Sequence, residues 1–180
     1  MSIQTLAKQG KTSVHRGLAE IDVSRLKGMR NEGLKNCFTH FDGWHSKLEF
    51  VAKIHDKRFV NDAASRTVSA TWYALENVDD ENVIWIARGS ANKLDYTPLL
   101  PEVRKKVQML ICVGENTKGL HDVFDGVVPM VLDEVDLKNA VHRSLYNNVM
   151  KATVIYSPSC SSEVSVEDDG AMFKKEVNEL

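Results

Sequence analysis

The sequence predicts an α/β domain whose mostly parallel β-sheet begins with an antiparallel β-hairpin. Short apolar runs of strand length alternate along the chain with segments of helical length. The run 83–87 is apolar throughout, as expected of a parallel strand that helices cover on both faces. Strands that alternate with helices imply right-handed crossovers and a parallel sheet. Residues 38–180 are therefore expected to form a Rossmann-like domain of three layers.

The leading hairpin is expected from residues 48–54 and 58–61, with His55, Asp56 and Lys57 in the turn. The remaining elements then alternate along the chain. They are expected as helix 65–76, strand 83–87, helix 98–107, strand 108–113, helix 118–124, strand 127–132, helix 133–150, strand 152–156 and helix 168–180. Pro98 is compatible with the first turn of its helix, because an N–H group at that position would have no acceptor within the helix.

Side-chain patterns predict the environment of several helical residues. The long helix 133–150 is expected to turn five apolar side chains inward, namely Val135, Leu137, Val141, Leu145 and Val149. The charge run 104–106 is expected to form a solvated helix face. The acidic residues at 163 and 167–169 are expected to complement the dipole of the last helix.

Composition excludes several classes of protein. A chain of 180 residues with a net charge of −2 is typical of one globular domain, and not of a general nucleic-acid or membrane-surface binder. No apolar run approaches the roughly 20 residues that span a bilayer. The three cysteines are far apart, lack a zinc-type Cys/His spacing and predict reduced thiols in the cytoplasm. We therefore predict no metal site, and we expect Cys112 to be a buried hydrophobic residue.

The N-terminal segment differs from the rest of the chain. Residues 1–37 are polar and weakly patterned, and they are expected to be a divergent, partly flexible segment. Residues 10–13 read Gly-Lys-Thr-Ser, like the end of a phosphate-binding loop. The full signature needs a glycine where Thr5 stands, so the match is interpreted as a coincidence or a remnant.

Ligands of open α/β sheets bind beyond the carboxyl ends of the strands. Four loops fall there, at 61–67, 88–93, 114–118 and 157–162. The first, second and fourth carry hydroxyls, amides and cations, which together suit a small anionic ligand. The alternative is that these polar residues only cap helices.

Five landmarks occur in the order found in one ligase family. They are Ser-Lys-Leu-Glu at 46–49, Asn-Asp-Ala-Ala-Ser-Arg-Thr at 61–67, Arg-Gly with a following Lys93 and Asp-Tyr at 88–96, Ser-Pro-Ser-Cys-Ser-Ser at 157–162, and Asp-Gly-Ala-Met-Phe at 169–173. Residues 41–180 thereby resemble the C-terminal domain of a Mur ligase of the MurD type. That family uses ATP and Mg²⁺ to add D-glutamate to a peptidoglycan precursor.

The resemblance implies roles for six residues. Ser162, Lys93 and Arg66 are implied to bind substrate, and Asp62, Lys47 and Asn61 are implied to lie on the nucleotide side. No catalytic residue is carried over.

The chain departs from the family at the positions that grip the amino acid. Ala64 stands where the glutamate-binding lysine belongs, and Arg66 stands where a threonine belongs, so Arg66 is the candidate to restore the charge. Lys47 replaces an arginine and loses its planar fork, and an ungapped alignment puts Asn92 where Lys93 is expected.

Three functions are consistent with these features. The first is a stand-alone homologue of the D-glutamate-binding domain, a pseudoenzyme without its own ligase activity or certain cofactor. The second is one part of a split or truncated ligase, which would use ATP and Mg²⁺ only with partner domains. The third is a non-catalytic scaffold or regulator that binds Mur ligase domains or other cell-wall precursor enzymes. None of the three involves nucleic acid or a membrane.

Overall fold

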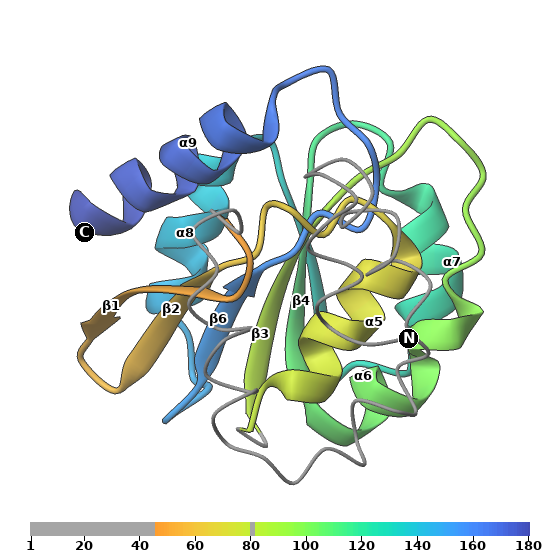
Figure 1. Cartoon of the computed structure of the whole chain (residues 1–180). Coiled ribbons are helices and arrows are strands. Elements are labelled where there is room, and N and C mark those ends of the chain that lie inside the picture. Colours follow the sequence, from red (N-terminus) through yellow and green to blue (C-terminus); the bar gives the residue numbers. More distant parts are fainter. Residues whose placement is uncertain (1–45, 80–81) are drawn as a thin grey trace, which may run out of the picture. The chain divides into compact units, whose positions relative to one another are not determined.

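A computed structural model describes residues 46–79 and 82–180 (Figure 1). Predictions for residues 1–37, including the Gly-Lys-Thr-Ser sequence, lie outside these ranges. The elements within them are β1 (Glu49–Ile54), β2 (Lys57–Asn61), α5 (Val68–Asn77), β3 (Val83–Arg88), the 3₁₀ turn η1 (Thr97–Leu99), α6 (Leu100–Lys106), β4 (Val107–Val113), α7 (Lys118–Phe124), β5 (Met130–Glu134), α8 (Leu137–Leu145), β6 (Thr153–Tyr156) and α9 (Val166–Asn178).

The sheet has the predicted topology. Its strand order is β1-β2-β6-β3-β4-β5, with β1 antiparallel to β2 and every other neighbouring pair parallel. The hairpin turns at His55, an exposed residue with a φ of 53°. Helices α5, α6 and α7 cover one face of the sheet, and α8 and α9 cover the other (Figure 1). The predicted three-layer α/β architecture is therefore confirmed.

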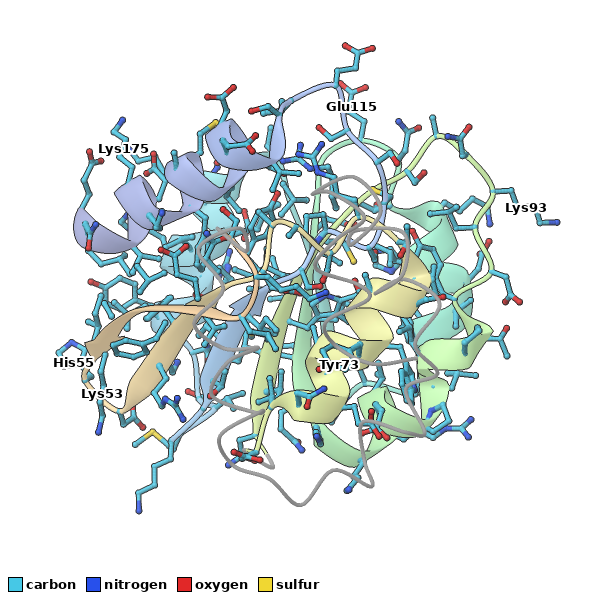
Figure 2. All side chains as sticks on the ribbon, in the orientation of Figure 1. Lys53, His55, Tyr73, Lys93, Glu115 and Lys175 are labelled. Atoms are coloured by element: carbon cyan, nitrogen blue, oxygen red, sulfur yellow. The ribbon has the colours of Figure 1, made fainter. Side chains whose placement is uncertain are left out.

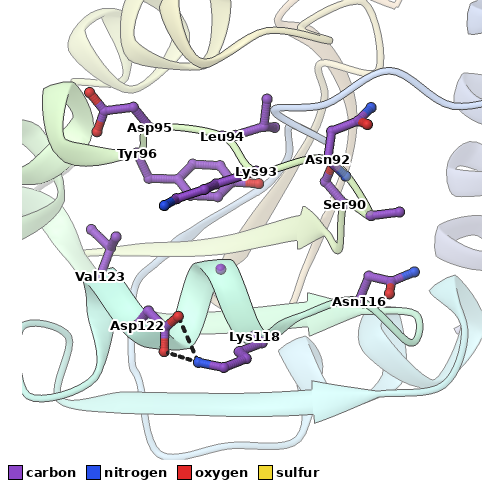
Figure 3. A pocket seen from close by; sticks show the side chains of 12 residues that line it. Ser90, Asn92, Lys93, Leu94, Asp95, Tyr96, Asn116, Lys118, Asp122 and Val123 are labelled. Carbon is purple, nitrogen blue, oxygen red and sulfur yellow. Dashed lines mark hydrogen bonds and ion pairs between the residues drawn. The ribbon is translucent and has the colours of Figure 1, made fainter.

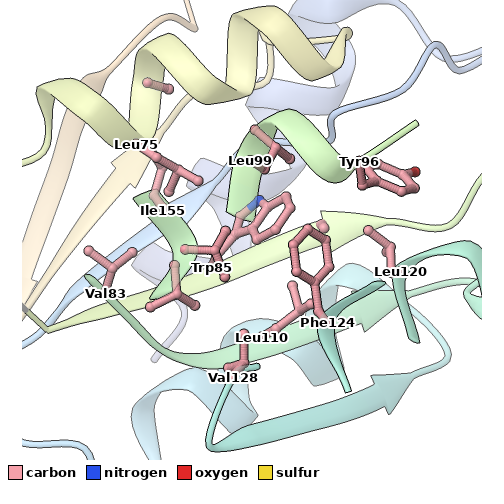
Figure 4. Packing of buried hydrophobic residues seen from close by; sticks show 14 of the residues in the cluster. Leu75, Val83, Trp85, Tyr96, Leu99, Leu110, Leu120, Phe124, Val128 and Ile155 are labelled. Carbon is pink, nitrogen blue, oxygen red and sulfur yellow. The ribbon is translucent and has the colours of Figure 1, made fainter. Parts of the chain in front are cut away.

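Each face of the sheet has its own core. On the α5–α7 face, Trp85 packs edge-on against Phe124 with ring centroids 5.4 Å apart, and both side chains are fully buried (Figure 4). The Trp85 indole N–H also donates to the carbonyl of Ser157 at 2.9 Å. This bond ties the middle of β3 to the loop after β6, which is one of the predicted ligand loops. Cys112 is also buried on this face, as predicted, and burial raises the pKa of its thiol to about 12.

Several predicted elements have different bounds, and the differences at α8 and β5 bear on individual predictions. Helix α8 begins after Asp136, whose carboxylate accepts the Asn139 N–H, and it ends at Leu145 rather than at residue 150. Val135 therefore precedes the helix and is 84% exposed, so its predicted inward position is wrong. Strand β5 starts at Met130 instead of residue 127, because Val127 and Val128 bond back to the end of α7.

The charge run 104–106 is not wholly solvated. Arg104 and Lys105 are exposed, but Lys106 is buried, and its ammonium donates to the carbonyls of Leu75, Glu76 and Val78 at 2.7–2.9 Å. These carbonyls lie at the C-terminal end of α5, where a helix has unpaired acceptors and a partial negative charge. Lysine 106 therefore joins α6 to the end of α5.

Lys57 makes the equivalent contact on the opposite face. Its buried ammonium donates to the carbonyls of Ser144 and Leu145 at the end of α8, and to the side-chain oxygen of Asn147. Burial lowers the pKa of Lys57, because the charged ammonium has lost much of its water.

Gly89 allows the loops after β3 and β4 to meet. We expect Gly89→Ala to lower the free energy of unfolding by about 1–3 kcal/mol in urea denaturation. The reason is that its Cβ would lie 2.7 Å from the carbonyl carbon of Asn116, which is backbone and cannot simply rotate away. Gly119→Ala is the control, since its Cβ would meet only Tyr96, at an ordinary 3.6 Å. Equal stabilities for the two variants would contradict this packing.

Among the helices that the structure describes, none is long and apolar enough to cross a membrane.

Candidate functional site

Three neighbouring strands bring the predicted ligand loops together. Strands β2, β6 and β3 are adjacent and parallel, so the segments after them meet at one edge of the sheet. Backbone bonds join these segments: the Ser159 N–H donates to Ser65 O at 2.9 Å, and the Arg88 N–H donates to Pro158 O at 3.2 Å. Backbone hydrogen bonds therefore hold the loops after β2, β3 and β6 together at the carboxyl ends of these strands.

A buried carboxylate lies at the centre of this edge. Asp169, in the first turn of α9, is fully buried, and its Oδ1 accepts from Arg88 Nη2 at 2.6 Å and from the Tyr156 hydroxyl at 2.9 Å. Its Oδ2 faces Arg66 Nη2 at 3.4 Å. One carboxylate is thus shared by two guanidinium groups.

The two arginines are held with different strength. The Arg88 contact is as short as a strong charge-assisted hydrogen bond, which typically measures about 2.7–2.9 Å or less. With the described residues, Arg66 makes two long contacts, 3.4 Å to Asp169 and 3.3 Å to the carbonyl of Ser162. Arg88 is therefore the main partner of Asp169, and Arg66 keeps bonding capacity for another anion.

Tyr156 keeps its proton in this network. Burial, and after it the neighbouring Asp169 carboxylate, raise the pKa of Tyr156 above its usual value. The phenol accepts from Arg88 and donates to Asp169, while its ring stacks on Phe173 at 5.3 Å. These contacts fix α9 against the end of β6.

The three residues implied to lie on the nucleotide side surround the end of β2. Asn61 is buried, and its amide donates to Glu49 Oε2 at 3.0 Å and accepts from the Ala63 N–H at 3.2 Å. Asp62 is also fully buried, and its Oδ1 accepts from the Leu48 N–H at 3.2 Å. Lys47 lies 5.4 Å from the ring centre of Tyr73. The structure therefore brings these residues together, with Asn61 and Asp62 inside the fold.

The Asp62 carboxyl has an unusual proton affinity. Burial raises its pKa to about 6, although the hydroxyls of Ser65 and Ser157 and the N–H of Leu48 favour the charged form. Between pH 4 and 6 the folded state therefore binds a proton that the unfolded state has released. The free energy of unfolding falls as pH rises through this window, by up to about 3 kcal/mol.

Asp62→Asn is expected to remove this pH dependence and to raise stability at pH 8, because no charge is then buried. Urea denaturation at pH 4, 6 and 8 measures both effects. Asp122→Asn, at an exposed position on α7, should keep the slope of the unmodified protein. An unchanged slope in Asp62→Asn would contradict the role of Asp62 in it.

Lys93 lies apart from the arginine network. It is exposed in the loop after β3 and extends outward from the molecule (Figure 2). With its neighbours and one side of α7 it lines a hollow, shown in Figure 3. The hollow is lined by Ser90, Ala91, Asn92, Lys93, Leu94, Asp95, Tyr96, Asn116, Lys118, Gly119, Asp122 and Val123. Of the three residues implied to bind substrate, the structure therefore brings together Arg66 and Ser162.

Sequence reasoning missed Arg88, Tyr156 and Asp169. A signal for Asp169 was present, because Asp169, Phe173 and Val177 recur every four residues and all three are buried. Its position on the apolar face of α9 distinguishes it from the exposed neighbours Glu167 and Asp168.

Comparison with known proteins finds ligases that are similar in sequence to the whole of this chain. No family model matches the chain. The chain is 32% identical, over 183 residues, to the UDP-N-acetylmuramoylalanine–D-glutamate ligase of Christiangramia forsetii. That alignment covers 100% of this chain and 41% of the relative, so the chain spans well under half the length of the curated ligase.

Solved structures support the fold. The Mur ligase MurC of Thermotoga maritima matches with a TM-score of 0.50 and 11% identity, over 94% of this chain and 38% of that one. A bifunctional folylpolyglutamate synthase/dihydrofolate synthase of Yersinia pestis, complexed with AMPPNP and manganese, matches with a TM-score of 0.51 and 14% identity. The match covers 72% of this chain and 31% of the synthase. At these identities the matches show a shared fold.

Proposed function

Because the chain is homologous to the C-terminal part of MurD-type Mur ligases, we propose that it is a divergent homologue of their D-glutamate-binding domain, without ligase activity of its own. The alignment with the curated relative covers 41% of the length of that ligase. Phosphoryl transfer from ATP relies on a phosphate-binding loop and bound cations that position the phosphates. ATP and Mg²⁺ would accordingly act only with further domains, in cytoplasmic cell-wall precursor synthesis.

One observation carries the proposed binding of D-glutamate, namely the position of Arg66. Its guanidinium lies 3.3 Å from the carbonyl of Ser162 and 3.4 Å from Asp169, both long contacts. It supplies a planar pair of N–H donors that suits a carboxylate, and it lies next to the serine implied to contact the amino acid. Arg66 would thereby compensate for Ala64, which stands where the family has its lysine.

Calorimetric titration with D-glutamate tests this site. We expect binding in the millimolar range, weakened about tenfold or more by Arg66→Gln, which corresponds to about 1.4 kcal/mol. Arg104→Gln removes an exposed arginine of α6 and should leave the affinity unchanged. No heat at millimolar D-glutamate, or equal affinity in Arg66→Gln, would refute the site.

Phosphate release from ATP tests the absence of independent ligase activity. With the UDP-linked precursor, D-glutamate, ATP and Mg²⁺ present, we expect no turnover by this chain. Turnover by the isolated chain would refute the proposal.

The alignment of this chain with 41% of a full-length ligase also favours a second function, namely as one part of a ligase that is assembled with partner domains. In that case turnover would appear when a chain that carries the ATPase and UDP-substrate domains is added. The same assay therefore distinguishes a pseudoenzyme from a split enzyme.

A further inference from the structure

Three metal-binding side chains meet where β4, β5 and α7 adjoin. Cys112 on β4 and Asp133 on β5 are paired in register on adjacent parallel strands, so their side chains leave the same face of the sheet. His121 approaches from α7, and its Nε2 lies 3.1 Å from Asp133 Oδ1. One ligand atom from each of the three residues lies within 4.8 Å of the other two.

A fourth residue orients the histidine. The carboxylate of Asp125 lies 3.0 and 3.2 Å from His121 Nδ1, one turn along the chain from His121. A metal-binding histidine typically donates its second ring N–H to such a carboxylate, which fixes the tautomer and the ring orientation. With its proton on Nδ1, His121 directs the lone pair of Nε2 toward Asp133 and Cys112.

We propose that Cys112 Sγ, His121 Nε2 and Asp133 Oδ1 bind a zinc ion, with Asp125 as the positioning residue. A thiolate, an imidazole and a carboxylate together suit Zn²⁺ and not Mg²⁺ or Ca²⁺, which bind oxygen ligands. Binding replaces the thiol proton: the Cys112 S–H bond breaks, a Zn–S bond forms, and the proton leaves to solvent.

The geometry requires only small movements. Zinc bonds of about 2.0–2.3 Å with tetrahedral angles place ligand atoms roughly 3.4–3.7 Å apart. The observed His121–Asp133 separation of 3.1 Å is close to this value, and the limit of 4.8 Å means that Cys112 is about one ångström too far at most. Side-chain rotation of His121 and Asp133 covers that difference, because both are partly exposed.

The cluster also offers an entry path and an open coordination position. The side chains of His121 and Asp133 are 26% and 56% exposed, whereas Cys112 is fully buried. An ion can therefore reach the cluster from solvent and contact the thiolate at its inner end. Three protein ligands leave the fourth tetrahedral position to water.

The site would stabilise one side of the domain. Strand β5 is at the edge of the sheet, and α7 is a helix of seven residues. A metal bound by β4, β5 and α7 would hold these elements together, and it would do so independently of D-glutamate binding. Zinc at a hundredfold excess over its Kd should raise the Tm by about 5 °C or more.

Calorimetry with zinc chloride and the full chain tests the proposal. We expect one ion per chain with a Kd in the micromolar range or tighter, and at least tenfold weaker binding in Cys112→Ser, His121→Gln and Asp133→Asn. Asp125→Asn should weaken binding about 10- to 100-fold, as loss of an orienting carboxylate does. Cys160→Ser and Asp122→Asn are the controls and should bind like the unmodified protein.

Cobalt spectroscopy identifies the ligands independently. Co²⁺ should give a thiolate-to-metal charge-transfer band that Cys112→Ser abolishes and Cys160→Ser retains. His121→Gln and Asp133→Asn change partly exposed side chains, so they test the site even where Cys112→Ser impairs folding. Absence of stoichiometric zinc binding would overturn the proposal. Unchanged affinity in all three ligand variants would overturn it equally, because the ion would then be bound elsewhere.

Discussion

Asp169→Ala is expected to lower the free energy of unfolding by about 3–5 kcal/mol, the largest effect that we predict for a single substitution. The change removes the only carboxylate that Arg88 and Arg66 are observed to share among the described residues. It also leaves the Tyr156 hydroxyl, which is buried, without its acceptor. The loss is costly because the two arginines, 17% and 24% exposed, keep most of the desolvation penalty of their charges without a partner carboxylate.

Urea denaturation at pH 7 measures this effect. Glu167→Ala is the matched control, since Glu167 lies in the same first turn of α9 but is exposed. It should cost less than about 1 kcal/mol, the value of an exposed acid at a helix N-terminus. A similar loss in both variants would mean that the helix dipole, and not the arginine network, accounts for the role of Asp169.

Lys106→Met is expected to lower the free energy of unfolding by about 3–4 kcal/mol, because three carbonyls at the end of α5, two of them buried, lose a charged donor at once. Methionine retains most of the volume of the lysine stem, so the loss reports on the hydrogen bonds more than on packing. Thermal or urea denaturation measures it.

Lys105→Met provides the comparison within α6. Lys105 is exposed, and its replacement should change stability by no more than about 0.5 kcal/mol. If the two variants lose the same stability, then the ammonium of Lys106 does not hold the end of α5.

Much of the fold is predictable because its strands are short apolar runs. The strand 83–87 and the hairpin around His55 are found within one or two residues of the predicted positions. The limits of α8 are less predictable, because apolar residues continue beyond both of its ends. The helix starts where the carboxylate of Asp136 accepts an N–H, and Val135 merely precedes that cap.

The candidate site is predictable only in part. The loops at 61–67 and 157–162 meet because parallel strands end at one edge, and Arg66 lies beside Ser162 there. The sequence places Asp169 correctly near the start of α9, where it complements the helix dipole, but does not predict its burial. For Lys106 the predicted solvation is wrong, because a charged residue in a polar run usually faces solvent. Their burial follows from tertiary contacts with Arg88 and with the end of α5, which no local pattern contains.

The proposed zinc site also depends on tertiary contacts that no local sequence pattern contains. Cys112, His121 and Asp133 come from three elements and have no spacing that marks a zinc motif. Only the register between β4 and β5 places the thiol beside the carboxylate. Spacing along the sequence, on which the prediction of no metal site is based, does not contain this pairing.

The most direct measurement of our central claim is nuclear magnetic resonance of the ¹⁵N-labelled chain during titration with D-glutamate. We predict that the largest shifts occur at the Arg66 side-chain N–H and at the backbone amide of Ser162, while signals around Lys93 remain unchanged. Shifts confined to the hollow around Lys93, or none at millimolar D-glutamate, would contradict the claim that this domain binds D-glutamate through Arg66.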